Sequence, residues 1–269
     1  LEETSQHYDV ARAFKNLILA GEQRHKGALH LLGDLYNNGT KTDKDSIKAA
    51  EYFKKAADLG DMPAYAKWVK LTEKDRSGKD KFKLGRFLLK ESRQVTENID
   101  EAFIWFKKAG ESGFPLGFYY SAILNEHIKK SFELAEVEGF YRLAADNGFE
   151  MASVRLLAQE GDKDSQYRLG LFYYNNFKDE IGFKGGTDTA NSLIEIDLVN
   201  DFINKDERLK SAFYWFEKAA QDGWFSSGNG AAKYKLGQFY EDGIFVDLDL
   251  KKASLNYEEA LDEGIEEAK

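Results

Sequence analysis

Histidine is the side chain most often found in catalytic and metal sites, and this chain has four: His7, His25, His30 and His127. His25 and His30 are five residues apart, so they would not share one face of a helix. None of the four shows the close, recurring spacing of a zinc site. The chain has no cysteine, which excludes disulfides, thiolate ligands and a thiol nucleophile. We therefore expect no metal and no cofactor, and we interpret the histidines as solvated or groove-lining.

Short catalytic motifs are also missing. The sequence has no Gly-x-Ser-x-Gly, no His-Glu-x-x-His and no phosphate loop ending in Gly-Lys-Ser/Thr. GFKGGT at 182–187 lacks the lysine in position, and we interpret it as a turn rather than a nucleotide site. Gly228 and Gly230 indicate a loop entering a helix, while Asp247 and Asp249 indicate helix capping rather than calcium binding. These patterns predict a protein that is not an enzyme.

The composition is that of a folded, acidic, helical protein. Of its 269 residues, 42% are hydrophobic and 14% aromatic, and two are proline, which favours helices over a sheet sandwich with Pro-rich turns. A net charge of -9 and a pI near 5.2 repel phosphate backbones, so we expect no nucleic-acid partner. No apolar stretch approaches the roughly 20 residues that cross a bilayer, so we expect no membrane insertion. The compartment stays open between an exported or periplasmic location and the cytoplasm, and the oligomeric state is open.

Five segments share one ending, which predicts a repeated helix. Small or apolar residues lie eleven, seven, four and three positions before a closing glycine, and these offsets form one helical stripe. The glycine stands where a helix C-cap favours a left-handed residue. We call these segments the B helices. They are KKAADLG at 54–60, KKAGESG at 107–113, RLAADNG at 142–148, EKAAQDG at 217–223 and EEALDEG at 258–264.

A second motif precedes four of the B helices, and we call its segments the A helices. They are LLGDLYNNG at 31–39, KLGRFLLKE at 83–91, RLGLFYYNN at 168–176 and KLGQFYEDG at 235–243. A glycine inside a helix costs about 1 kcal/mol relative to alanine, so its recurrence needs a reason. We predict that Gly33, Gly85, Gly170 and Gly237 make room for the alanines and aromatic rings of the paired B helix. The third of these pairs is longer than the rest, and we place its insertion at 177–206.

With these motifs the chain resembles the Sel-1-like repeat family, relatives of the tetratricopeptide repeats. Residues 28–60 and 232–264 match the family pattern nearly position for position, and 161–170 followed by 208–223 matches once the insertion is removed. The stretch 114–148 keeps its B helix but has Ser121 and Ala122 where the Leu-Gly pair of an A helix should stand. The resemblance implies an all-α fold, a right-handed superhelical α/α solenoid of antiparallel helix pairs.

The resulting organisation is a single solenoid domain over 1–269. We place the repeats at about 24–60, 79–113, 114–148, 162–223 and 228–264. Extra helices are expected at about 8–20, 62–75 and 150–160.

The resemblance also implies where a ligand would bind, because the A helices of such a solenoid line its concave wall. The A-helix residues off the packing stripe would then face the groove, where aromatic and Arg side chains favour protein binding. The alternative is that they pack against neighbouring repeats. These residues are His30, Asp34, Asn37, Asn38, Phe82, Arg86, Tyr167, Leu171, Tyr174, Tyr234, Gln238 and Glu241.

The leading functional hypothesis is a non-enzymatic scaffold or adaptor, of bacterial origin, that binds a protein or peptide on its concave face. The insertion at 177–206 would either contribute to recognition or be a surface elaboration. One alternative is an immunity protein that neutralises a toxin by plugging its basic active site. Another, from a different class, is a hydrolase whose site is assembled across repeats. A deep pocket with converging, pKa-shifted groups beside the insertion would favour the hydrolase.

Overall fold

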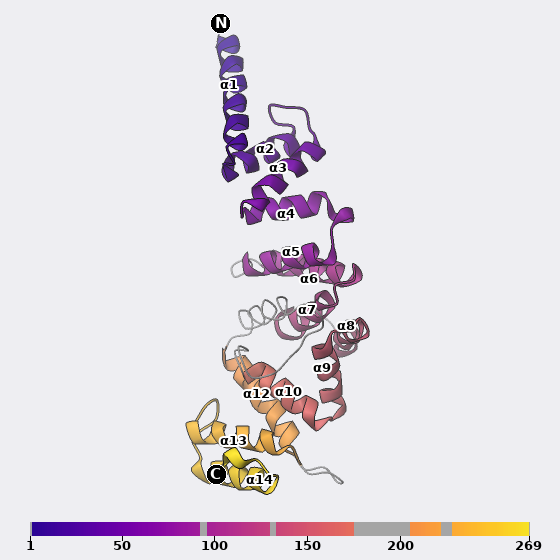
Figure 1. Cartoon of the computed structure of the whole chain (residues 1–269), viewed down its shortest axis with the longest axis vertical. Helices are drawn as coiled ribbons and strands as arrows, with labels where there is room; N and C mark the ends of the chain where they lie inside the picture. Colours follow the sequence, from indigo (N-terminus) through magenta and orange to yellow (C-terminus); the bar gives the residue numbers. More distant parts are fainter. Residues whose placement is uncertain (1, 92–95, 130–132, 175–204, 222–227, 269) are drawn as a thin grey trace. The chain divides into compact units, whose positions relative to one another are not determined.

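The computed structural model describes residues 2–91, 96–129, 133–174, 205–221 and 228–268. The chain divides into two compact units, Leu1–Gly117 and Phe118–Lys269, and Figure 1 shows the order of their helices. Each described element is a helix, a turn or a loop, so the all-α class is confirmed. None of the described helices is both long and apolar enough to cross a bilayer.

The first unit consists of helices that pack in the order of the chain. The pairs α2–α3 and α5–α6 make the most extensive contacts, and α4 lies between them, against α3 and α5. Each pair joins an A helix to its B helix, as the repeat motifs predict. The elements are α1 (Glu2–Glu22), α2 (Lys26–Asn38), α3 (Ser46–Asp58), α4 (Met62–Leu71), the 3₁₀ turn Glu73–Asp75, α5 (Gly78–Glu91) and α6 (Thr96–Glu111).

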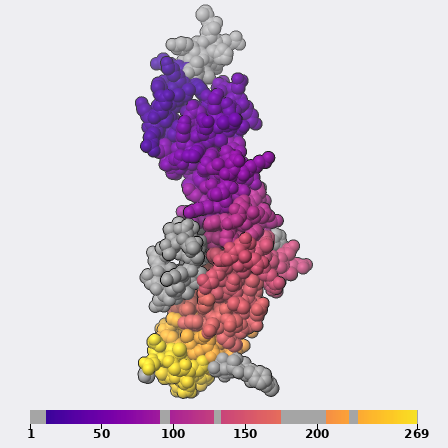
Figure 2. Space-filling view, turned by 45° about the vertical axis from the view of Figure 1, so that its right-hand side comes forward, coloured from indigo at the N-terminus to yellow at the C-terminus, as the bar shows by residue number. Residues whose placement is uncertain are grey.

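In the second unit the helices also pack in the order of the chain, but the unit begins with α7 and a π-helical turn. Its tightest pairs are α10–α12 and α13–α14, and α9 packs against both α8 and α10. The elements are α7 (Leu116–Leu124), the π-helical turn Asn125–Lys129, α8 (Leu134–Asp146), α9 (Glu150–Glu160), α10 (Lys163–Tyr174), α12 (Lys205–Ala220), α13 (Gly230–Asp242), α14 (Leu250–Asp262) and the 3₁₀ turn Glu266–Ala268. Figure 2 shows the last of these helices, in yellow, at the surface of this unit.

The helices end and begin as the sequence predicts. Four of the five B-helix glycines have a left-handed backbone, with φ of 84° at Gly60, 81° at Gly113, 86° at Gly148 and 88° at Gly264. The fifth lies outside the described residues. Asp249 caps α14 by accepting hydrogen bonds from the backbone N–H groups of residues 251 and 252. The capping interpretation of this aspartate is therefore confirmed.

Each A-helix glycine faces an aromatic ring of its B helix. A Cβ built on Gly85 would lie 2.8 Å from Phe106, and one on Gly170 would lie 2.6 Å from Phe216. One on Gly237 would lie 2.4 Å from Tyr257. These distances are far shorter than a van der Waals contact, so the prediction that the glycines make room for the B-helix rings is confirmed.

The extra helices are present as α1, α4 and α9, although α4 ends at Leu71 and a 3₁₀ turn follows it. The insertion predicted at 177–206 lies outside the described residues except for Lys205 and Asp206, which already belong to α12. The turn predicted at 182–187 also lies outside them. The assignment of a single domain with the repeat boundaries given above stays a prediction.

Candidate functional site

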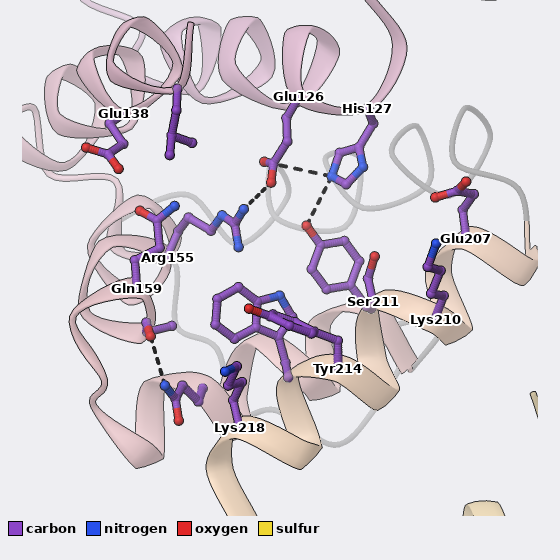
Figure 3. Close-up of a pocket in the computed structure, with 15 residues that line it drawn as sticks. Glu126, His127, Glu138, Arg155, Gln159, Glu207, Lys210, Ser211, Tyr214 and Lys218 are labelled. Atoms are coloured by element: carbon purple, nitrogen blue, oxygen red, sulfur yellow. Dashed lines mark hydrogen bonds and ion pairs between the residues drawn. The ribbon is translucent and has the colours of Figure 1, made fainter. Parts of the chain in front are cut away.

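The second unit contains a cleft of about 790 Å³ between the π-helical turn, α8, α9, α10 and α12. Figure 3 shows Glu126 and Arg155 on one side of it and a row of α12 side chains on the other. None of the twelve residues predicted to bind a partner lines this cleft. The described lining residues are Glu126, His127, Leu134, Glu138, Arg155, Ala158, Gln159, Gln166, Tyr173, Glu207, Lys210, Ser211, Tyr214, Trp215 and Lys218.

The inner wall of the cleft is built around an ion pair whose cation is buried and whose carboxylate is partly exposed. Arg155 of α9 is 6% exposed, and its Nη2 donates a hydrogen bond to Glu126 Oε1. The guanidinium carbon lies 5.1 Å from the ring centroid of Trp215 and 5.5 Å from that of Tyr141. Nε and Nη1 have no hydrogen-bond acceptor in the structure, and such aromatic faces stabilise a desolvated guanidinium. The cation is thus held in one orientation by its carboxylate and two rings.

The turn that follows α7 positions the partner of this arginine. Residues 125–129 form a π-helical turn, a rare local widening that often occurs at functional sites. It places Glu126 where Tyr141 of α8 also donates a hydrogen bond to its Oε2, at 2.6 Å. The neighbouring His127 lies 3.2 Å from the hydroxyl oxygen of Tyr173, measured from its Nε2. Glu126 therefore links α8 and α9 through two hydrogen bonds.

The tyrosines of this wall are held in their neutral form. Burial, reinforced by the nearby charge of Glu126, raises the pKa of Tyr173 and Tyr141 well above the ordinary value of a phenol. Both hydroxyls therefore stay protonated at any physiological pH. An arginine side chain keeps its positive charge throughout this range as well. These groups offer fixed donors and a fixed charge rather than a proton that can be exchanged near neutral pH.

The opposite wall is the exposed face of α12, whereas Trp215 of the same helix is buried against Arg155. Tyr214 is 49% exposed, and the Lys218 ammonium lies 5.6 Å from its ring centroid. Lys210 and Glu207 are exposed on the same helix face, as Figure 3 shows. Leu134, at the start of α8, adds an apolar side chain that is 68% exposed. The rim thus combines charges of both signs with aromatic and aliphatic surface.

The predicted residues of the second unit form a separate surface on α10 and α13. Lys235 of α13 lies over the rings of both Tyr174 and Tyr234, with its Nζ 5.5 and 5.9 Å from their centroids. Gln238 donates a hydrogen bond to the Tyr234 hydroxyl at 3.2 Å. Two successive A helices therefore bring predicted residues together. We call these four residues, with Tyr167 and Leu171, the A-helix face.

The predicted residues that stand three positions before each A-helix glycine take part in more packing than the sequence suggests. The four rings three residues before the A-helix glycine all contact the B-helix ring that the glycine accommodates. The centroid distances are 5.7 Å for His30–Phe53, 5.3 Å for Phe82–Phe106, 5.8 Å for Tyr167–Phe216 and 5.6 Å for Tyr234–Tyr257. Phe82 also packs on Phe114 and is 5% exposed, so this side chain belongs to the core and offers no binding surface. The other three are half-buried.

The predicted residues of the first unit include a polar cluster that joins α2 to α4. Lys67 Nζ lies 2.6 Å from Asp34 Oδ1 and 2.9 Å from His30 Nε2. His30 Nδ1 lies 3.0 Å from Asp61 Oδ2. Asn37 donates a hydrogen bond to Asn38 at the end of α2. These contacts connect one repeat to the next helix, so His30 and Asp34 have structural partners of their own.

Two further predicted residues lie outside these clusters. Arg86 is half-buried on α5, and Glu241 of α13 accepts a hydrogen bond from the Tyr257 hydroxyl. Within the described part of the chain, no three His, Asp or Glu side chains come together in a way that would hold a metal ion.

Sequence reasoning missed the residues of the cleft, although one signal marked them. Arg155 stands on the buried stripe of α9 with Met151, Ala152 and Ala158. A charged residue on an apolar stripe requires a buried partner. Glu126 could not be found in this way, because its position depends on a π-helical turn that no repeat motif predicts.

Successive helix pairs, with a glycine facing an aromatic ring in each, define a helical repeat protein. The Sel1 repeat model matches residues 27–61, 81–114, 163–176, 201–224 and 230–265, which is just over half of the chain. The chain therefore belongs to the Sel1 repeat family, whose members are generally protein-interaction scaffolds. The family model has no match over the stretch that supplies Glu126, His127 and Arg155.

Two solved structures are similar to this chain at low identity. One is a Sel1 repeat protein from Oxalobacter formigenes, 21% identical, covering 97% of this chain and 79% of its own, with a TM-score of 0.32. The other is c5321, a protective antigen of uropathogenic Escherichia coli strains that displays an SLR fold. It is 18% identical, covering 96% of this chain and 66% of its own, with a TM-score of 0.29.

Proposed function

We propose that this chain is a non-enzymatic scaffold and that the cleft of its second unit holds a short segment of a partner protein. The observation that carries the proposal is the pairing of two different walls. A rigid wall has Arg155 fixed between Glu126, Tyr141 and Trp215. The facing wall on α12 is exposed and carries Tyr214 and two lysines.

The chemistry of the rim suits a peptide. Lys210 and Lys218 would attract carboxylates, and Glu138 and Glu207 would attract basic side chains. Tyr214 and Leu134 supply exposed aromatic and aliphatic surface, and aromatic side chains contribute much of the binding energy in protein interfaces. A peptide segment offers charged, polar and apolar groups within a few residues, so it matches this mixture.

The raised pKa values of the two buried tyrosines give no support to the hydrolase alternative. A pocket beside the insertion with shifted pKa values was the feature expected to favour an enzyme. The cleft does adjoin the start of α12, and the pKa values of Tyr141 and Tyr173 are indeed raised. The shift moves them away from neutral pH, whereas a general acid or base needs a pKa near the working pH. These groups are therefore suited to recognition.

The A-helix face is a second candidate surface in the same unit, separate from the cleft. Tyr174, Tyr234 and Gln238 lie together around Lys235, so this face offers aromatic and cationic groups on two successive repeats. In the first unit, the remaining candidates are His30, Asp34, Asn37, Asn38 and Arg86. We propose each set as a contact surface of its own unit.

Selection of a random peptide library against the full chain tests the proposal. Enriched peptides are expected, and the double substitution Lys210→Ala with Lys218→Ala should weaken their binding about tenfold or more, as measured by fluorescence polarisation. Lys74→Ala with Lys79→Ala removes two exposed lysines of the first unit and should leave affinity unchanged. Failure to enrich any peptide, or equal affinity for both double variants, would contradict the cleft as the binding site.

A further inference from the structure

Two loops of this chain have the same backbone but opposite surface chemistry. The first, residues 39–46, joins α2 to α3, and the second, residues 243–250, joins α13 to α14. Each opens with a left-handed glycine, Gly39 at φ 68° and Gly243 at φ 63°. Each then has a non-glycine residue at φ 66°, Lys41 in the first loop and Phe245 in the second.

The hydrogen bonds of the two loops also correspond. The N–H of Asp45 donates to Tyr36 O at 2.9 Å, and the N–H of Asp249 donates to Tyr240 O at the same distance. Both aspartates cap the following helix by accepting from two backbone N–H groups at 3.0 to 3.1 Å. The loop conformation is therefore set by the glycine, the cap and the backbone.

The side chains of the two loops are very different. The first loop reads GTKTDKDS and the second reads GIFVDLDL. Phe245 stands where Lys41 stands, Leu248 where Lys44 stands and Leu250 where Ser46 stands. In the second loop these three are 47%, 62% and 62% exposed, so their apolar surface faces solvent. Because the first loop adopts the same backbone with polar side chains, folding does not require apolar residues at these positions.

The backbone strain at Phe245 is a second sign that folding does not require an apolar residue at this position. A bulky residue at positive φ is strained, by roughly 1 kcal/mol or more. One side of its ring packs on Phe213, at a centroid distance of 5.8 Å, yet nearly half of the side chain stays exposed. Large apolar side chains that are exposed together mark interaction surfaces. We call Ile244, Phe245, Leu248 and Leu250 the apolar loop.

The charges around the apolar loop indicate what covers it. Residues 241–250 contain four carboxylates, Glu241, Asp242, Asp247 and Asp249, and no basic residue. The matching stretch of the first repeat, 37–46, contains two of each sign. Lys251 and Lys252 follow on α14, and Lys252 lies over the Tyr240 ring and near Asp249. A second copy of the chain would bring like charges together, and an anionic membrane would be repelled.

We propose that the apolar loop is a docking surface for a basic amphipathic helix of a partner protein. The apolar face of such a helix would cover Phe245, Leu248 and Leu250, and its Lys or Arg residues would meet Asp242 and Asp247. This inference shares with the proposed function only the class of ligand, because the surface is distinct from the cleft.

A pair of designed peptides tests the docking surface on the full chain. The probe is a helix of about 18 residues, or five turns, with a leucine face and lysines elsewhere, and its counterpart carries glutamates instead. The lysine peptide should bind in the micromolar range and the glutamate peptide at least tenfold more weakly. The quadruple substitution Ile244→Thr, Phe245→Asn, Leu248→Gln and Leu250→Ser keeps the net charge. It should weaken binding of the lysine peptide at least tenfold, without loss of helicity in circular dichroism.

Two controls distinguish the apolar loop from the cleft and from general charge attraction. Lys210→Ala with Lys218→Ala alters the cleft and should leave the lysine peptide bound as before. A matching loss would place binding in the cleft and overturn the assignment. If the lysine peptide bound the wild type and the quadruple variant equally, its binding would be general attraction to an acidic protein. That result would also overturn the assignment of the apolar loop as the docking surface. A third result would overturn it as well: a wild-type dimer in sedimentation analysis that is absent in the quadruple variant. In that case a second copy of the chain would cover the apolar loop.

Discussion

A Cβ atom built on Gly33 of α2 would lie 2.5 Å from two ring carbons of Phe53 on α3. Phe53 is fully buried, so its ring has no room to withdraw. The same contact recurs at Gly85, Gly170 and Gly237 in the other A helices. The glycine therefore lowers the helix propensity of α2 but allows the two helices to approach more closely. This close approach defines the repeat.

The Gly33→Ala substitution should destabilise the first unit in spite of alanine's higher helix propensity. Overpacking of a filled core costs about 1–3 kcal/mol, which outweighs a gain of about 1 kcal/mol in propensity. Urea denaturation followed by circular dichroism measures the change. Adding Phe53→Leu to Gly33→Ala should recover part of the loss, since the smaller side chain gives the methyl group space.

Gly139 is the matched control for this substitution. It lies inside α8, and a Cβ built on it would meet nothing within 4 Å. Gly139→Ala should therefore raise the free energy of unfolding by about 0.5–1 kcal/mol. If both alanine substitutions raised the free energy of unfolding, propensity alone would account for the change and the packing role of Gly33 would be wrong.

The repeat fold was readable from the sequence because it depends on local, periodic features. The closing glycines, the A-helix glycines and the B-helix rings stand at fixed offsets, and each has one physical role. The register of His30, Tyr167 and Tyr234 was harder to interpret. A ring at that position both packs on the B helix and reaches the surface, so periodicity alone could not separate the two roles.

The cleft could not be predicted, because it forms where the repeat pattern fails. Glu126 follows α7, which has Ser121 and Ala122 where the Leu-Gly pair of an A helix would stand, and its direction depends on a π-helical turn. Arg155 belongs to α9, one of the helices outside the repeat motif. The contact between them spans 29 residues of sequence, and no spacing rule connects such positions.

Acid should weaken the first unit through Asp61. Burial alone would raise the pKa of this carboxyl group, but hydrogen bonds from the Ala64 N–H and from His30 outweigh burial and lower the pKa below 3.8. Since the unfolded chain has the higher pKa, the unfolded state binds the proton more readily. The stabilisation is thus complete above about pH 4 and is lost as the pH falls through the lower, folded pKa.

The Asp61→Asn variant measures this contribution. At about pH 6 it should be less stable than the wild type, and the difference in unfolding free energy should shrink as the pH falls below about 4. Asp43→Asn, at an exposed position in the first loop, should show no such dependence. A difference between wild type and Asp61→Asn that stays constant down to about pH 2 would contradict the role of the charge.

Substitutions that break the ion pair between Arg155 and Glu126 should destabilise the second unit. Their effects on the free energy of unfolding should be coupled. Arg155→Leu leaves the carboxylate of Glu126, which is 25% exposed, without its cation, so the loss should be smaller than the roughly 3–5 kcal/mol of a fully buried pair. Arg155→Lys keeps the charge but loses the planar stacking between Tyr141 and Trp215, so a smaller loss is expected. Arg142→Leu, at an exposed position on α8, should change stability by less than about 0.5 kcal/mol.

A double-mutant cycle then separates the charge from the packing. Glu126→Gln removes the uncompensated charge and still accepts the hydrogen bond from Tyr141. Combined with Arg155→Leu, it should cost at least about 1 kcal/mol less than the sum of the two single losses. Additive losses would mean that Arg155 stabilises the unit through its ring contacts alone. In that case, the fixed cation on the inner wall of the cleft would not depend on Glu126, and the π-helical turn would have another purpose.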